Sequence, residues 1–159
     1  MYRVLIADDD ILMREALHVM IAKDSAFKVV SMTDTGERAV RVCKEDVIDI
    51  VFMDMQMPGI TGLEASRIIH QSNPEISIYI LSAHAANVLI RSAAQSQVKD
   101  VLEKPITYSC LKKIMENYKT EHEDSVQNQL EILASYLRNK DFGDFYDGIA
   151  GVIDEIYAI

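Results

Sequence analysis

Acidic residues follow two apolar runs of the sequence in a way that could form a site for a hard cation. Asp8, Asp9 and Asp10 come directly after the run VLIA, and Asp54 comes directly after the run IVFM. Carboxylate oxygens suit Mg²⁺, which keeps several waters and commonly bridges to phosphoryl oxygens. A solvated acidic turn is the plain alternative for the run of three, so the acids alone are weak evidence.

A hydroxyl and an ammonium follow two later apolar runs. Ser82 comes after YIL, and Lys104 comes shortly after VL. A carboxylate can attack phosphorus as a nucleophile, while a metal ion and a lysine offset charge on the transferring oxygens. Lys104 beside Pro105 could be an ordinary surface residue at a turn, but its combination with Ser82 and Asp54 predicts a phosphoryl site.

Five short runs of β-branched and large apolar residues alternate with segments of helical periodicity. The expected strands are 3–7, 28–32, 50–53, 76–81 and 100–102, and the expected helices are 11–23, 35–45, 62–72, 85–96 and 107–119. This alternation predicts an α/β fold with a doubly wound, five-stranded parallel sheet covered by helices on both faces. Such sheets bind ligands at the carboxyl ends of their strands, where the acids, Ser82 and Lys104 are expected to meet.

Composition and charge exclude several classes of protein. The chain has 159 residues, of which 49% are hydrophobic and 26% charged, which is typical of a globular protein and not of a disordered one. No apolar run approaches the roughly 18 residues of a membrane helix, and the acids at 8–10 interrupt the apolar start, so we expect no signal peptide and a cytoplasmic location. Cys43 and Cys110 lie far apart and are expected to be reduced thiols.

The last forty residues break the alternation of strands and helices. Residues 120–159 hold 2 Lys+Arg against 9 Asp+Glu, whereas residues 1–119 hold 14 against 16, so DNA binding by this chain alone is not expected. Apolar residues recur with helical spacing at 126, 130, 133 and 137, and again from 142 to 156. We therefore expect one domain at 1–119 that carries the chemistry and a helical linker or extension at 120–159. The apolar end Ile156 to Ile159 further predicts that the natural protein continues into an output domain.

Four blocks of the sequence resemble the signature blocks of the response-regulator receiver family of two-component signal transduction. They are VLIADDD, DIVFMDMQMPGITGLEA, ILSAHA and DVLEKPI, in family order and at family spacing over about residues 2–119. The resemblance implies a flavodoxin-like or CheY-like (βα)5 fold with a C-terminal helical extension. It also implies a phosphoprotein, and not an enzyme in the usual sense, that takes phosphoryl groups from small donors and dephosphorylates itself.

The resemblance assigns roles residue by residue. Asp54 would accept the phosphoryl group from a sensor histidine kinase, and Mg²⁺ would be held by Asp8, Asp9, Asp54 and the backbone carbonyl of Gln56. Ser82 would be the switch hydroxyl, and Lys104 would pair with the phosphoryl group. A cis peptide bond is expected before Pro105, and Asp10 is expected to have at most a water-mediated role.

The sequence departs from the family pattern at two positions. Val101 stands three residues before Lys104, where the family usually has an aromatic residue coupled to the switch hydroxyl, and Gln97 stands where a glycine is usual. Both changes leave the phosphoryl chemistry in place but call the usual route of signal transmission into question. Gln56 and His84 occupy positions that tune the lifetime of the phosphoryl group in this family.

Two other functions share part of this pattern. Haloacid-dehalogenase-type phosphatases also use an aspartate after a strand, but they need a second acid two residues later, where this chain has Gln56. The stronger alternative is a receiver-like protein-interaction module that works without phosphorylation, since Val101 and Gln97 deviate from the pattern. The retained acids and Lys104 favour phosphorylation.

The expected output is transcription regulation through a domain outside this sequence. The segment from Leu81 to Ile106 is similar to receivers that precede AraC-type helix-turn-helix domains. The expected partners are therefore a histidine kinase, a second copy of the chain in a homodimer, and DNA only through the output domain. No membrane contact is expected.

Overall fold

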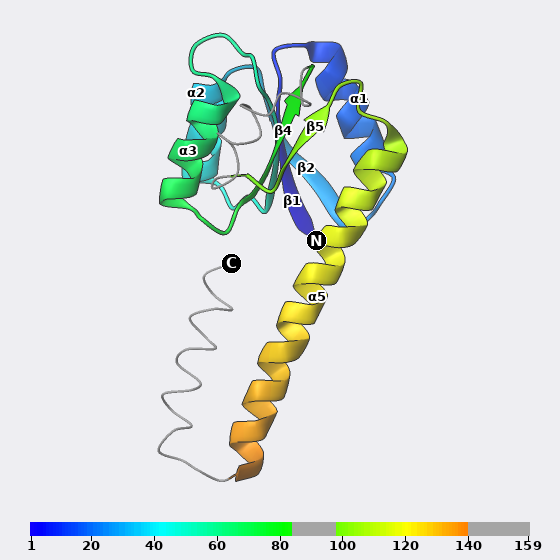
Figure 1. The fold of residues 1–159 in the computed structure, drawn as a ribbon, viewed down its shortest axis with the longest axis vertical. Helices are drawn as coiled ribbons and strands as arrows, with labels where there is room; N and C mark the ends of the chain where they lie inside the picture. The colour runs from blue at the N-terminus through cyan, green and yellow to red at the C-terminus, as the bar shows by residue number, and fades with distance from the viewer. Residues whose placement is uncertain (84–97, 140–159) are drawn as a thin grey trace. The chain divides into compact units, whose positions relative to one another are not determined.

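The computed structural model describes residues 1–83 and 98–139 and has an α/β architecture built on one parallel sheet (Figure 1). The five strands are parallel and lie in the order β2-β1-β3-β4-β5. The elements are β1 (Tyr2–Ala7), α1 (Ile11–Ile21), β2 (Phe27–Thr33), α2 (Gly36–Glu45), β3 (Ile50–Asp54), α3 (Gly62–Ser72), β4 (Ser77–Ser82), β5 (Asp100–Glu103) and α5 (Tyr108–Asn139). The predicted doubly wound parallel sheet is confirmed.

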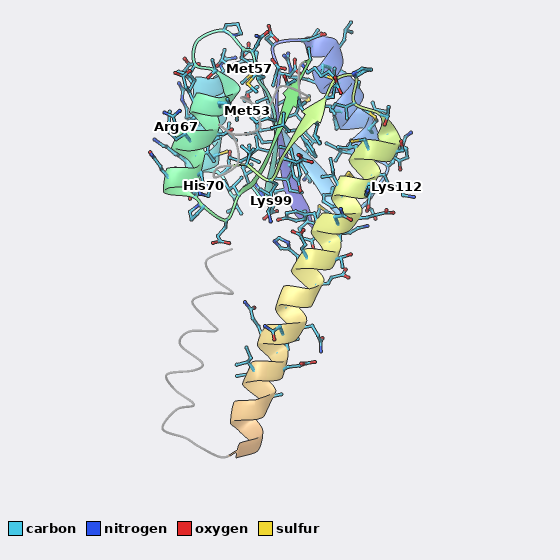
Figure 2. All side chains as sticks on the ribbon, viewed as in Figure 1. Met53, Met57, Arg67, His70, Lys99 and Lys112 are labelled. Carbon is cyan, nitrogen blue, oxygen red and sulfur yellow. The ribbon has the colours of Figure 1, made fainter. Side chains whose placement is uncertain are left out.

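Helices cover both faces of this sheet, α1 on one face and α2 with α3 on the other (Figure 1). The strands are apolar at nearly every position because both faces are buried. Val51 and Met53 belong to the core cluster that contains residues of α2 and α3, and Figure 2 shows Met53 on that side. Phe52 lies between them in the strand and so points to the opposite face, where it stacks on Tyr79 with ring centroids 5.5 Å apart.

Side-chain caps start the first three helices. Asp10 accepts a hydrogen bond from Leu12 at the start of α1, and Thr35 does the same for α2. At α3, Thr61 and Glu64 form a reciprocal capping box. The caps of α1 and α2 follow β1 and β2 closely, whereas the cap of α3 lies at the end of the longer loop 55–61, and in each case the residues after the strand lie at the carboxyl edge of the sheet.

The last described helix is longer than the sequence predicts. We expected one helix at 107–119 and a separate one after it, but α5 runs without a break from Tyr108 to Asn139. No Gly or Pro lies between them to stop the helix, since the sequence there reads YKTEHED. The chain divides into two compact units inside this helix, Met1–Leu111 and Lys112–Ile159.

Some predictions fall on residues outside the described ranges. They are the helix at 85–96, the roles of His84 and Gln97, and the second tail helix from 142 to 156. In the part of the chain that the structure does describe, no helix is long and apolar enough to cross a membrane.

Gly62, the first residue of α3, lies against the end of β3. Its N–H donates to the carbonyl of Met55 at 3.0 Å, which closes the loop between β3 and α3. A Cβ atom at Gly62 would overlap the backbone carbonyl of Asp54 and would lie 3.2 Å from the Cα of Met55. Only glycine lets α3 begin this close to Asp54.

Gly62→Ala should therefore lower the free energy of unfolding by about 3 kcal/mol, at the upper end of overpacking costs, because the atoms it meets are backbone. Urea denaturation followed by circular dichroism measures this change. Gln71→Ala, on the exposed face of the same helix, serves as the control and should be nearly neutral. A Gly62→Ala protein as stable as wild type would show that the approach of α3 is not tight.

Candidate functional site

The carboxyl ends of four strands bring the predicted site residues to one edge of the sheet. Asp8 follows β1, Asp54 ends β3, Ser82 ends β4 and Lys104 follows β5. After β1 the chain adds β2 on one side of the sheet, and after β3 it adds β4 and β5 on the other side. The direction of winding therefore reverses between β1 and β3, and α/β sheets form their ligand crevice at such a switch point. Asp8, after β1, and Asp54, at the end of β3, lie on either side of that switch point.

Three carboxylates meet at this edge. Oxygens of Asp8, Asp9 and Asp54 all lie within 4.8 Å of one another. Asp8 and Asp54 are buried, while Asp9 is exposed. The cluster therefore has protein on one side and an open side through which a cation with its waters could enter, which is how Mg²⁺ is usually held.

Lys104 joins the two buried acids. Its Nζ lies 2.8 Å from Oδ2 of Asp8 and 2.6 Å from Oδ1 of Asp54, and its side chain is 22% exposed. The peptide bond between Lys104 and Pro105 is cis, as predicted. Three carboxylates against one ammonium leave a formal charge of −2, so the donor set fits a divalent cation in both type and charge.

Burial and charge shift the proton affinities of this group. Burial raises the pKa of the Asp54 carboxyl above its ordinary value, with the nearby Asp8 charge adding to the effect, although Lys104 and the Gln56 N–H oppose it. Burial would lower the pKa of Lys104, but its hydrogen bonds and charge interactions with Asp54 and Asp8 outweigh that cost, and its pKa lies above the ordinary value. Lys104 is thus a fixed cation beside a carboxylate that is costly to ionise.

Backbone groups hold the two buried acids in place. The N–H of Gln56 donates to Oδ2 of Asp54 at 2.9 Å, and the N–H of Asp10 donates to Oδ1 of Asp8 at 2.9 Å. The side chain of Asp10 instead accepts from Leu12 at 2.8 Å to cap α1. Asp10 is not part of the carboxylate cluster found among the described residues, and its observed role is structural.

Ser82 lies at the same edge, and Val101 lies two residues before the end of the neighbouring strand β5. Ser82 is buried, and its carbonyl accepts from the Lys104 N–H at 2.9 Å, so the two polar residues sit on neighbouring strands. Val101 is buried in the core cluster shared with α2 and α3. A short, branched side chain packed there has no ring that could turn between two positions.

Two residues near the edge were not identified from the sequence. Arg14, in α1, donates a hydrogen bond through a guanidinium nitrogen to the carbonyl of Asp8. Glu37, in the first turn of α2, accepts from the N–H of Ile60 at 3.0 Å. Arg14 could have been found as a basic residue one turn after the acidic run, but nothing in the local sequence around Glu37 indicates a partner 23 residues away.

Known proteins similar to this chain are response regulators. The "Response regulator UvrY" of Escherichia coli (strain K12) is 38% identical over 104 residues, covering 65% of this chain and 48% of that protein. The REC domain of AraT, a response regulator from Geobacillus stearothermophilus, has 26% identity and a TM-score of 0.71, covering 78% of this chain and 97% of that domain. A two-component response regulator of the LuxR family from Aurantimonas sp. SI85-9A1 has 27% identity and a TM-score of 0.66, covering 72% and 82%.

The chain thus spans about half the length of the curated relative. Residues 4–116 match the family described as "Response regulator receiver domain". This segment contains all of the sheet except the first two residues of β1, together with the carboxylate cluster and Lys104. The chain therefore belongs to the response regulator receiver domain family.

Proposed function

We propose that this receiver accepts a phosphoryl group on Asp54 from a histidine kinase, in a reaction that requires Mg²⁺. The observation that carries the proposal is the double ion pair of Lys104 with Asp8 and Asp54 beside a third carboxylate. A cation fixed against the acceptor carboxylate is positioned to pair with the incoming phosphoryl oxygens. Asp54 is buried, but the exposed Asp9 beside it marks the open side of the cluster, from which the phosphohistidine of a kinase would approach.

The chain's own residues perform the transfer as follows. An oxygen of Asp54 attacks phosphorus, the P–N bond of the phosphohistidine breaks, and its electron pair leaves with the imidazole. Lys104 pairs with a phosphoryl oxygen, and the Ser82 hydroxyl donates to another once the group has been transferred. Asp8, Asp9, Asp54 and the backbone carbonyl of Gln56 would hold Mg²⁺, which supplies positive charge against the transferring oxygens.

The same site would also react with small phosphodonors and lose its phosphoryl group to water. It would not act on other substrates, because Gln56 stands where haloacid-dehalogenase-type phosphatases need a second acid. A receiver-like interaction module that works without phosphorylation is the alternative. The ion pairs of Lys104 with Asp8 and Asp54 favour phosphorylation over this alternative, because binding of a partner protein at another surface would not require them.

We further propose that residues 1–119 form the receiver domain and 120–159 an extension toward an output that regulates transcription. The AraC-type class follows from the similarity of Leu81 to Ile106 noted above. The match to a LuxR-family regulator names the second candidate class. A homodimer and a cytoplasmic location, where a kinase would meet this chain, complete the proposal.

Intact mass after incubation with acetyl phosphate tests the proposed function. Wild type should gain one phosphoryl group with Mg²⁺ and none with EDTA, and Asp54→Ala should gain none under either condition. Asp46→Ala removes an exposed acid at the far end of α2 and should be labelled like wild type. A folded wild type that neither gains the group nor binds beryllofluoride, which mimics it, would favour the interaction module.

The electrostatics of Asp54 predict a gain in stability when its charge is removed. Because its pKa is raised in the fold, the folded state loses stability as pH rises through that pKa, and the loss persists at neutral pH. Asp54→Asn should therefore raise the free energy of unfolding at neutral pH without metal, because it removes the costly buried charge while Lys104 keeps its ion pair with Asp8.

Urea titrations of wild type and Asp54→Asn in EDTA, at pH values from about 3 to about 8, measure this difference, because that range includes the ordinary Asp pKa of about 3.9. Wild type should gain more stability from added Mg²⁺ than the variant, because the variant lacks one of the three carboxylates. An Asp54→Asn protein that is less stable than wild type at neutral pH would show that the ion pair with Lys104 outweighs burial.

A further inference from the structure

The loop between β3 and α3, residues 55–61, is closed at both ends by backbone hydrogen bonds. The N–H of Met55 donates to the carbonyl of Leu81 on β4 at 2.8 Å, and its carbonyl accepts from Gly62 at 3.0 Å. Thr61 is held by its capping box with Glu64. With its two ends fixed, the remaining freedom of the loop lies in its tip, from Met57 to Ile60.

The first turn of α2 contacts that tip at three points. The Glu37 carboxylate accepts from the Ile60 N–H through Oε1 at 3.0 Å. A Cβ atom on Gly36 would lie 2.7 Å from Cγ1 of Ile60, and one on Gly59 would overlap the Glu37 carboxylate. Gly59 also has φ +86°, which side chains rarely adopt. Two glycines therefore allow Glu37 to reach the loop backbone.

The position of this loop determines the position of the acceptor carboxylate. Gln56, two residues after Asp54, donates its N–H to Oδ2 of Asp54, and the buried Met57 follows it (Figure 2). A shift of the tip would move Gln56 and with it the orientation of Asp54. Glu37 itself is not one of the clustered carboxylates found in the described residues.

We propose that Glu37 is a positioning residue, whose hydrogen bond to Ile60 holds the β3–α3 loop in the conformation that presents Asp54 and Gln56 to a divalent cation. The inference rests on the proposed function, because it assumes that the cluster binds Mg²⁺. It deepens that function by adding a residue on a different element. Groups that orient metal ligands typically affect metal affinity by about 10- to 100-fold, and Glu37 acts through the loop backbone.

Two substitutions separate the reach of Glu37 from its charge. Glu37→Gln keeps a side-chain oxygen at the same distance but removes the charge, whereas Glu37→Asp keeps the charge but is one methylene too short. If the hydrogen bond matters, Glu37→Gln should bind Mg²⁺ within about twofold of wild type, since an exposed charge is largely screened. Glu37→Asp should then bind about tenfold more weakly.

Isothermal titration with Mg²⁺ alone measures these affinities, and thermal unfolding confirms that each variant is folded. Glu45→Gln removes a charge from the last turn of the same helix and should leave the affinity unchanged. The exchange rate of the Ile60 amide, measured by NMR without metal, should rise in Glu37→Asp and not in Glu37→Gln. A merely structural role would change the unfolding temperature without this pattern in Mg²⁺ affinity.

A double-mutant cycle of Glu37→Asp and Gly59→Ala gives a second test, in which the Mg²⁺ affinities of the single and double variants are compared. Gly59→Ala alone should weaken Mg²⁺ binding, because the new Cβ displaces the Glu37 carboxylate. In the Gly59→Ala background, Glu37→Asp should then cost less than it does in wild type, so the two losses are not additive.

The two possible failures are distinguishable. A wild type that does not bind Mg²⁺ would overturn the proposed function. A wild type that binds it, with Glu37→Asp equal to wild type and Glu37→Gln weakened, would overturn the positioning role and leave only a charge effect. Additive losses in the cycle would overturn it as well.

Discussion

The contact of the Lys104 ammonium with both Asp8 and Asp54 is the interaction on which the site depends. Two buried carboxylates this close to a third would repel one another strongly, and burial alone already makes the ionised form of Asp54 costly. Lys104 offsets part of that cost at 2.8 and 2.6 Å. It leaves a formal charge of −2 on the described cluster, so the oxygen ligands suit a divalent cation in type and charge.

The parallel sheet is what makes this contact possible. Asp8 and Lys104 are 96 residues apart, yet each lies just beyond the carboxyl end of a strand in one sheet. The strands between them are buried on both faces, which leaves little room for their ends to move. The loops after the strands are fixed in turn by helix caps, by Gly62 against Asp54, and by Glu37 against Ile60. The rigid sheet and the fixed loops thus hold the charged side chains in defined positions at the carboxyl edge.

Much of this arrangement could be predicted from the sequence, and the remainder follows from packing that the sequence does not display. The strands follow from local apolar runs, their parallel arrangement follows from the alternation of these runs with helical segments, and α3 begins at Gly62 as predicted. The gathering of Asp8, Asp9, Asp54 and Lys104 follows from the rule that strand ends share an edge. The contact of Glu37 with Ile60 depends on how α2 packs beside the β3–α3 loop, which no local pattern encodes. The alternation of strands and helices predicts a helix that ends at 119, whereas α5 continues to Asn139 because no Gly or Pro interrupts it.

The most direct test of the account is to identify the residue that carries the phosphoryl group. The protein is incubated with acetyl phosphate and Mg²⁺, treated with borohydride to reduce an aspartyl phosphate to homoserine, and digested for peptide sequencing by tandem mass spectrometry. The account predicts homoserine at position 54 and at no other aspartate, and its loss when Mg²⁺ is replaced by EDTA. Homoserine at Asp8 or Asp9 instead, or its absence from a folded, Mg²⁺-bound protein, would contradict the assignment of Asp54 as the acceptor.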